Sequence, residues 1–241
     1  MLLWLLVMRN DYSDLTIIIP VLNECQTINI LVRRLLDRYH NCSIIVADDG
    51  STDGTNEIVK KFSIENKKVL LLDRTNKPKH GLTASVIDAA LRVQTSKIVV
   101  MDGDLQHPPE KVSAIHKALD ESDLVVAVRT YIKDWDLHRK IISRFVSSFV
   151  YFVMRLRNKQ VCNDILSGFF GIKSHLFKSI IKKNKRQFVG SGYKVLLDIL
   201  RVSNTNLNMA EVEYRTFHKR EYGKSKANIK QFIAVMKSTL S

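Results

Sequence analysis

The chain has 241 residues, 45% of them hydrophobic, with few glycines and prolines and no repeat or low-complexity tract. This composition predicts a globular protein whose length suits one α/β domain, and it excludes a fibrous or disordered chain. The formal net charge of +14 makes nucleic acid, anionic lipid surfaces and phosphorylated substrates the candidate partners. Cys25, Cys42 and Cys162 lack CxxC spacing, so they predict a reducing setting without disulfides or a zinc site.

No run of about twenty apolar residues occurs, so we expect no segment that spans a bilayer by itself. Residues 1–8 (MLLWLLVM) are apolar, but they have neither a basic start nor a small-residue cleavage site, which argues against a secretory signal. We expect an apolar N-terminal extension at 1–14, one domain at 15–226 and an amphipathic C-terminal helix at 227–241.

Short apolar runs alternate with segments of helical periodicity from residue 15 onward. We expect strands at 15–19, 43–47, 69–72, 98–101 and 124–128, and helices at 26–39, 56–62, from Gly81 to about 93 and from Pro108 onward. This alternation predicts right-handed βαβ units and a mostly parallel sheet flanked by helices.

After Arg129 we expect helices at 137–156 and 191–201 and a last strand at 212–216. The helix at 137–156 has basic ends on an apolar body. It is therefore either an interfacial helix on a lipid surface or a core helix with solvated ends.

The end of the fourth expected strand carries the clearest chemical signal. Four apolar residues, 98–101, are followed by Asp102, Gly103, Asp104 and then Gln106. In an open parallel sheet ligands bind at the carboxyl ends of the strands. Two carboxylates and an amide oxygen form an all-oxygen set that suits Mg²⁺ or Mn²⁺ rather than zinc. Such an ion can neutralise a diphosphate, so the segment predicts a nucleotide-diphosphate site.

Two earlier turns add to this signal. The segment 20–24 (PVLNE) follows the first expected strand, and 48–55 (DDGSTDGT) follows the second. An ordinary turn with a helix cap at Ser51 or Asp53 is the alternative interpretation of the second segment. No Gly-x-Gly-x-x-Gly follows the first strand and no P-loop occurs, so dinucleotide-binding and P-loop proteins are not indicated.

The three turns together resemble those of family-2 glycosyltransferases, which have the GT-A fold. Four later motifs resemble the dolichyl-phosphate mannose synthase branch of that family. These motifs are WDLHRKIIS (135–143), DILSGFF (164–170), GYKVLLDIL (192–200) and REYGKSK (220–226). The resemblance covers about 15–226. It implies that these residues form a GT-A catalytic domain, with a mostly parallel central sheet and amphipathic membrane-facing helices.

The resemblance also implies roles for individual residues. The expected nucleotide-sugar-binding residues are Pro20, Leu22, Glu24, Asp48, Asp49, Gly81, Asp102, Arg220 and Lys226. The expected metal ligands are Asp102, Asp104 and Gln106, and the expected catalytic residues are Asp104, Arg129, Arg139 and Ser143, the last two at the acceptor phosphate. Here Gly81-Leu82-Thr83 replaces the commoner Gly-Leu-Gly, and Ile165 replaces a usual proline.

The implied reaction is transfer of a hexose, with mannose from GDP-mannose preferred, to dolichyl or polyprenyl phosphate. It would use Mg²⁺ or Mn²⁺ and invert the anomeric carbon. One alternative is a UDP-sugar-dependent glucosyl- or N-acetylhexosaminyltransferase acting on the same lipid. A second is a non-enzymatic basic module that binds membrane or nucleic acid, which explains the charge but not three acidic turns at strand ends.

The expected partners are the nucleotide-sugar donor, polyprenyl phosphate and a membrane surface, and no nucleic acid. We expect peripheral attachment at the cytoplasmic face of a membrane. The attachment would use the helix at 141–156, the C-terminal amphipathic segment or a separate membrane-anchoring subunit.

Overall fold

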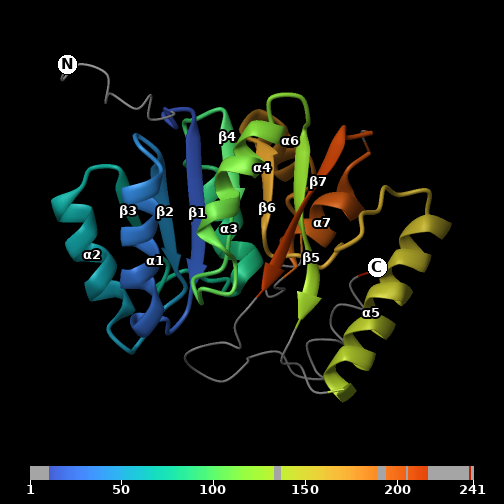
Figure 1. The fold of residues 1–241 in the computed structure, drawn as a ribbon, viewed down its shortest axis with the longest axis horizontal. Helices are drawn as coiled ribbons and strands as arrows, with labels where there is room; N and C mark the ends of the chain where they lie inside the picture. The colour runs from blue at the N-terminus through green and yellow to red at the C-terminus, as the bar shows by residue number, and fades with distance from the viewer. Residues whose placement is uncertain (1–10, 133–136, 189–193, 205, 217–238, 240–241) are drawn as a thin grey trace, which may run out of the picture.

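The computed structural model describes residues 11–132, 137–188, 194–204, 206–216 and 239. These residues form a seven-stranded sheet of order β3-β2-β1-β4-β6-β5-β7 with helices on both faces (Figure 1). The strands are β1 (Leu15–Val21), β2 (Ser43–Asp48), β3 (Val69–Asp73), β4 (Lys97–Val100), β5 (Leu124–Ile132), β6 (Phe170–Lys173) and β7 (Met209–Thr216). The helices are α1 (Cys25–Arg38), α2 (Thr55–Glu65), α3 (Leu82–Ala90), α4 (Val112–Ala118), α5 (Leu137–Leu156), α6 (Ser174–Asn184) and α7 (Val195–Val202).

The sheet is parallel except for β6, which runs antiparallel to both of its neighbours, β4 and β5. The expected mostly parallel α/β architecture is therefore confirmed. The carboxyl ends of the other six strands meet at one edge, and the arrowheads of β5 and β7 point to it at the bottom of Figure 1. Strand β6 and helix α6 were not predicted from the sequence.

Two apolar layers hold the helices on the sheet. One layer packs α1, α2 and α4 on one face, and the other packs α3, α6, α7 and part of α5 on the opposite face. Successive residues of β1 divide between these layers, with Ile17 and Ile19 in the first and Ile18 in the second. Because both faces are covered, the central strands are continuous apolar runs rather than alternating ones.

Strand β1 continues through Pro20 to Val21, although the sequence predicts that it ends at Pro20. Pro20 has no N–H for the ladder. It is accommodated because β4 pairs with β1 only over Leu15–Ile18, while Pro20 lies opposite Ala47 of β2. The strand can therefore carry a proline near its end without disrupting the sheet.

Helix α5 has the bounds expected from the sequence, and it projects from the right side of the sheet in Figure 1. Side chains are described from Phe145 onward in this helix. Val146, Val150 and Met154 belong to the apolar layer that also contains residues of α3, α6 and α7. Among the described residues, no helix combines the length and the apolar character needed to cross a membrane. The expected C-terminal helix at 227–241 and residues 1–10 of the N-terminal extension lie outside the described residues, apart from residue 239.

Candidate active site

The turns after β1 and β2 are joined by hydrogen bonds. The Asn23 N–H donates to Ser51 Oγ at 2.8 Å, and the Thr52 N–H donates to Asn23 Oδ1 at 2.8 Å. The Glu24 N–H donates to Thr55 Oγ1 at 2.9 Å. These bonds position Leu22, which is exposed, and the half-buried Glu24 beside the second acidic turn. The segments 20–24 and 48–55 therefore form one connected loop pair.

Asp48 stabilises its own turn. Its Oδ1 accepts hydrogen bonds from the N–H groups of Gly50 and Ser51, at 3.2 and 2.8 Å, and from the Ser51 hydroxyl at 2.6 Å. Its Oδ2 is buried and has no hydrogen-bond partner among the described residues. Asp48 therefore stabilises the turn, and its expected contact with a nucleotide stays a prediction.

Asp49 is held by a buried arginine that the sequence analysis did not single out. Arg74 is 1% exposed and forms ion pairs with Asp49 and, at 3.0 Å, with Asp88. It also donates to Ser85 Oγ at 2.9 Å. Asp49 Oδ2 accepts the Gly81 N–H at 2.6 Å, and Gly81 has φ of 125°, a value that side-chain-bearing residues rarely adopt. Asp49, Arg74 and Gly81 therefore fix the loop between β3 and α3 against the turn after β2.

The Asp-x-Asp turn follows β4 at the same edge. The Asp102 N–H donates to His107 Nδ1 at 3.0 Å, while His107 Nε2 lies 3.7 Å from Asp102 Oδ2. Burial lowers the pKa of His107 to about 3, so its ring is neutral at physiological pH. The ring stacks on Phe169 with centroids 5.0 Å apart. His107 thus supports Asp102.

Both carboxylates of this turn are accessible in part. The side chain of Asp102 is 34% exposed, and Asp104 is half-buried with Oδ1 accepting the Gln106 N–H at 3.1 Å. Gly103 has no room for a side chain, because an added Cβ would lie 2.8 Å from Val21 Cγ1. The close contact with β1 therefore sets the path of the turn. No cluster of three or more His, Cys, Asp or Glu side chains with metal-binding geometry occurs among the described residues.

The loop before β6 lies directly against Asp102. A Cβ built on Gly168 would be 3.1 Å from Asp102 Oδ2 and 3.2 Å from Oδ1. Ser167 Oγ donates to the Ala127 carbonyl at 2.9 Å, and Lys194 Nζ donates to the Leu166 carbonyl at 2.7 Å. This loop, 164–168, therefore forms a fixed support under the Asp102 carboxylate.

Arg129, in the second half of β5, interacts with the charged side chains around the Asp-x-Asp turn. Burial opposes its charge, but the interactions with Tyr214, Asp164 and Asp102 raise its pKa above the usual value. Arg129 therefore stays cationic next to the Asp-x-Asp turn. Asp102 interacts with Arg129, both Asp104 and Arg129 act on the charge of His107, and Gln106 follows in the same turn. The loop pair and Gly81 lie at the ends of β1, β2 and β3.

Four predicted residues cannot be located by their side chains. Arg139 and Ser143 are part of α5, but their side chains fall outside the described part of the structure. Arg220 and Lys226 lie in 217–238, which is also outside it. The roles expected for these residues stay predictions.

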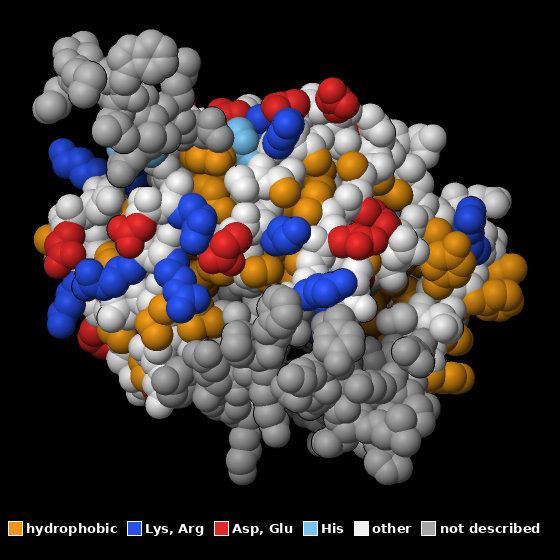
Figure 2. Space-filling model, in the orientation of Figure 1, with side chains coloured by type: hydrophobic (Ala, Val, Ile, Leu, Met, Phe, Trp, Pro, Cys, Tyr) orange, Lys and Arg blue, Asp and Glu red, His pale blue; other side chains and the backbone are white. Residues whose placement is uncertain are grey.

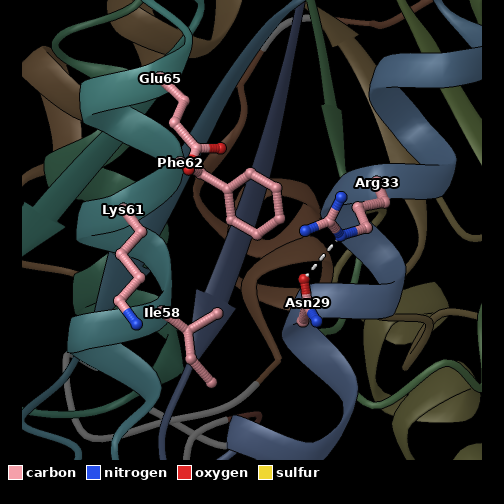
Figure 3. Close-up of a pocket in the computed structure, with 6 residues that line it drawn as sticks. All are labelled: Asn29, Arg33, Ile58, Lys61, Phe62 and Glu65. Atoms are coloured by element: carbon pink, nitrogen blue, oxygen red, sulfur yellow. Dashed lines mark hydrogen bonds between the residues drawn. The ribbon is translucent and has the colours of Figure 1, made fainter.

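A separate hollow lies on the surface between α1 and α2 (Figure 3). In it the Arg33 guanidinium lies 5.4 Å from the centre of the Phe62 ring, and Asn29 Oδ1 accepts the Arg33 Nε–H at 3.0 Å. Its lining includes none of the strand-end residues. We assign the chemistry to Asp102, Asp104, Gln106 and Arg129, called the strand-end group below, and not to this hollow.

Comparison with known proteins identifies the family. The sequence profile described as glycosyl transferase family 2 matches residues 16–183. The chain belongs to glycosyl transferase family 2. The family consists of enzymes, so the chain is a glycosyltransferase, and the enzymatic interpretation is favoured over the non-catalytic binding module.

Curated relatives narrow the comparison further. This glycosyltransferase is 32% identical over 226 residues to the dolichol-phosphate mannosyltransferase of Mycosarcoma maydis, an alignment that covers 88% of the chain and 72% of the relative. It is 28% identical over 240 residues to the Saccharomyces cerevisiae protein of the same name, covering 94% of the chain and 84% of the relative. The expected resemblance to dolichyl-phosphate mannose synthases is therefore confirmed.

A solved structure supports the fold. Glucosyl-3-phosphoglycerate synthase from Mycobacterium tuberculosis, crystallised with Mn²⁺, UDP and phosphoglyceric acid, superimposes with a TM-score of 0.64 at 17% identity. The match covers 94% of this chain and 75% of that one. The expected GT-A fold of the glycosyltransferase is confirmed by this similarity.

Three residues of the site were not assigned a role from the sequence. Arg74 lies in a polar loop, which by itself indicates a solvated side chain. Gly168 and Lys194 lie within the motifs 164–170 and 192–200, but their contacts with the Asp102 region depend on how distant loops pack. Their position inside these motifs is the one signal that could have drawn attention to them.

Proposed function

We propose that this glycosyltransferase transfers mannose from GDP-mannose to dolichyl or polyprenyl phosphate. The names of the curated relatives support the acceptor and the sugar. The single structural observation that carries the proposal is the group at the end of β4, where two accessible carboxylates, Asp102 and Asp104, lie beside the cationic Arg129. Such a group binds phosphates only if a cation accompanies the carboxylates, because carboxylates alone would repel them.

A divalent ion, Mg²⁺ or Mn²⁺, fits this group. Asp102, Asp104 and Gln106 offer side-chain oxygens, and Mg²⁺ typically binds one or two carboxylates and completes its coordination with water and substrate phosphates. The two carboxylates of the turn therefore suffice when a diphosphate is present. When bound, the ion would stabilise the negative charge that develops on the departing nucleotide diphosphate.

The other residues would bind and orient the two substrates. Pro20, Leu22, Glu24, Asp48 and Asp49 line the loop pair where the nucleoside would lie. Gly81 contacts Asp49 through its N–H, so it fixes the loop that would approach the sugar nucleotide.

The acceptor phosphate is already anionic at neutral pH, so it needs orientation and neutralisation rather than a strong base. Arg129 would supply both, together with Arg139 and Ser143 of α5. Arg220 and Lys226 would bind the diphosphate. Direct displacement by the acceptor oxygen would invert the anomeric carbon.

A donor screen tests the proposal. The purified protein is incubated with Mn²⁺, a short polyprenyl phosphate and, separately, GDP-mannose, UDP-glucose or UDP-N-acetylglucosamine. We expect lipid-linked sugar from GDP-mannose. Transfer from a UDP-sugar alone would replace the proposed donor with the alternative one, and no lipid-linked product from any donor would contradict the function itself.

We also propose that the protein works at a membrane surface through α5. Phe145, Phe152 and Leu156 are 64%, 60% and 68% exposed, although each is large and apolar. Figure 2 shows hydrophobic side chains gathered on the right, over α5, with Lys and Arg nearby. Arg155 lies 5.7 Å from the centre of the Tyr151 ring at the same end of the helix. One face of α5 is thus buried in the domain, and the other suits a lipid interface.

We propose that this membrane attachment is at the cytoplasmic face, where the setting is reducing. Free cysteines are typical of such a setting, and Cys25, Cys42 and Cys162 are all free.

Flotation with anionic liposomes tests the attachment. We expect the Phe145→Ser/Phe152→Ser variant to float less than the wild type, because burial of each phenylalanine contributes about 1.5 to 3 kcal/mol. Equal flotation of both proteins would assign attachment to the C-terminal segment, and failure of both proteins to float would require a separate membrane-anchoring subunit.

A further inference from the structure

We propose that Lys194 binds a substrate phosphate together with Arg129, and that these two cations form one subsite of the transfer reaction. The inference rests on the proposed function for the identity of the reaction. The phosphate belongs either to the lipid acceptor or to the nucleotide donor, and the experiment below distinguishes the two sources.

Lys194 is placed next to the reacting groups although it is far from them in the sequence. It directly precedes α7, and its Nζ donates to the Leu166 carbonyl at 2.7 Å. Two residues further along that loop, Gly168 packs against the Asp102 carboxylate, where an added Cβ would lie 3.1 Å from Oδ2. The ammonium group is therefore part of the wall beside the proposed metal ligand.

The charges around Lys194 show that two cations share this wall. Lys194 and Arg129 are close enough to repel each other, and Asp102 and Asp164 attract both. Burial lowers the pKa of Lys194 to about 8. The attraction of Asp102 and Asp164 opposes this effect, and the repulsion from Arg129 adds to it by the smallest amount. The side chain still carries its proton in most molecules at neutral pH. Lys194 and Arg129 are both half-buried, so each keeps only part of its hydration and favours anions beside it.

The reaction brings further anions next to these two cations. A sugar-nucleotide diphosphate and a polyprenyl phosphate together bring about three to four negative charges into one site, and a divalent ion offsets only two of them. Arg129 and Lys194 add two positive charges next to Asp102. Arginine offers a planar fork of donors, whereas lysine offers a compact point charge, and both suit phosphate oxygens.

A purely structural role for Lys194 makes a different prediction. If the side chain only connects the Leu166 carbonyl to the start of α7 by a hydrogen bond, its loss would lower the stability of the fold. It would also change kcat and the KM values of both substrates together. A phosphate-binding role would instead change one Michaelis constant selectively. Lys159 provides a matched control, because its Nζ also donates to a backbone carbonyl, that of Ser203 at 3.0 Å, but lies outside the strand-end group.

The experiment compares the full-length wild type with Lys194→Met, Lys194→Arg and Lys159→Met in Mn²⁺-dependent transfer from GDP-mannose to a short polyprenyl phosphate. We expect Lys194→Met to raise the KM of one substrate about ten- to a hundredfold, the effect of losing a charged hydrogen bond. Lys194→Arg should restore it to within about threefold. A rise for polyprenyl phosphate assigns the subsite to the acceptor, and a rise for GDP-mannose assigns it to the donor.

Two results would overturn the proposal. One is an unchanged pair of KM values in Lys194→Met. The other is a proportional loss of every kinetic constant together with a lower melting temperature. If the wild type transfers no sugar, the proposed function fails, and calorimetric titration of GDP with Mn²⁺, and of the polyprenyl phosphate, into the same variants still tests Lys194.

A second measurement does not depend on a folded variant. Acetic anhydride labelling of the wild type, mapped by mass spectrometry, should show several-fold protection of Lys194 by GDP with Mn²⁺ or by the polyprenyl phosphate, and none of Lys159. Equal labelling of Lys194 with and without each ligand would contradict the inference.

Discussion

Replacing Gly168 by alanine tests whether the position of the Asp102 carboxylate matters for metal use. The new Cβ would lie 3.1 and 3.2 Å from the two carboxylate oxygens and 3.4 Å from Asp102 Cγ, so the carboxylate must move by a few tenths of an ångström. Metal–oxygen distances tolerate about 0.2 Å. We therefore expect the Mn²⁺ concentration for half-maximal activity to rise about tenfold or more. The free energy of unfolding should fall by about 1 to 3 kcal/mol, as is usual for overpacking.

The assay is a Mn²⁺ titration of mannose transfer at saturating donor and acceptor, with urea unfolding as the stability measurement. Gly171→Ala is the matched control, because its Cβ would lie 2.4 Å from Ile115 Cγ2, on the side of α4 and away from Asp102. The control should lose more stability than Gly168→Ala and keep the wild-type Mn²⁺ requirement. A wild-type requirement in Gly168→Ala, or an equal rise in both variants, would refute the reasoning.

Two further predictions follow from buried groups. Arg74→Met should lower the free energy of unfolding by about 3 kcal/mol or more, since it leaves Asp49 buried without its cation, and should raise the KM of the sugar nucleotide but not of the acceptor. An unchanged donor KM would contradict the role of Asp49. Burial holds the pKa of His107 at about 3, below its ordinary 6.5, so the unfolded chain binds more protons between these values and stability falls as the pH is lowered. From about pH 7.5 to about pH 5 the wild type should lose about 2 kcal/mol more than His107→Gln, and equal losses in urea unfolding would contradict the buried neutral ring.

The sequence predicts those elements whose signals are local. The buried strands of the parallel half are visible because both of their faces are covered, and the Asp-x-Asp turn is visible because acidic residues follow such a strand directly. Strand β6 was missed because it has only four residues, one of which is Gly171. That glycine is required by the close approach of α4 and weakens the strand signal.

Helix α6 was missed for a related reason. It begins directly after β6, and its N-cap residue, Lys173, makes no side-chain cap. It lacks the Ser, Thr, Asp or Asn cap that marks a helix start in the sequence. Its apolar residues Phe177, Ile180 and Ile181 become informative only when the sheet that they cover is known.

The residues of the site also divide into those that the sequence predicts and those that it does not. The residues at the strand ends could be predicted because sheet topology alone brings them together. Arg74 and Lys194 could not, because their contacts with Asp49 and with the loop before β6 depend on tertiary packing. Leu22, Asp48 and Gln106 occupy the expected turns, and their contacts with substrate stay predictions.

The central claim is that a divalent ion at the end of β4 lets the departing diphosphate carry its charge. The most direct measurement is a crystal structure of the protein soaked with Mn²⁺ and GDP, with anomalous diffraction data that locate the manganese. We predict one peak between the diphosphate and the side chains of Asp102 and Asp104, absent in Asp104→Asn crystals treated in the same way. Manganese and diphosphate bound elsewhere, or a peak that persists at full height in the variant, would contradict the account.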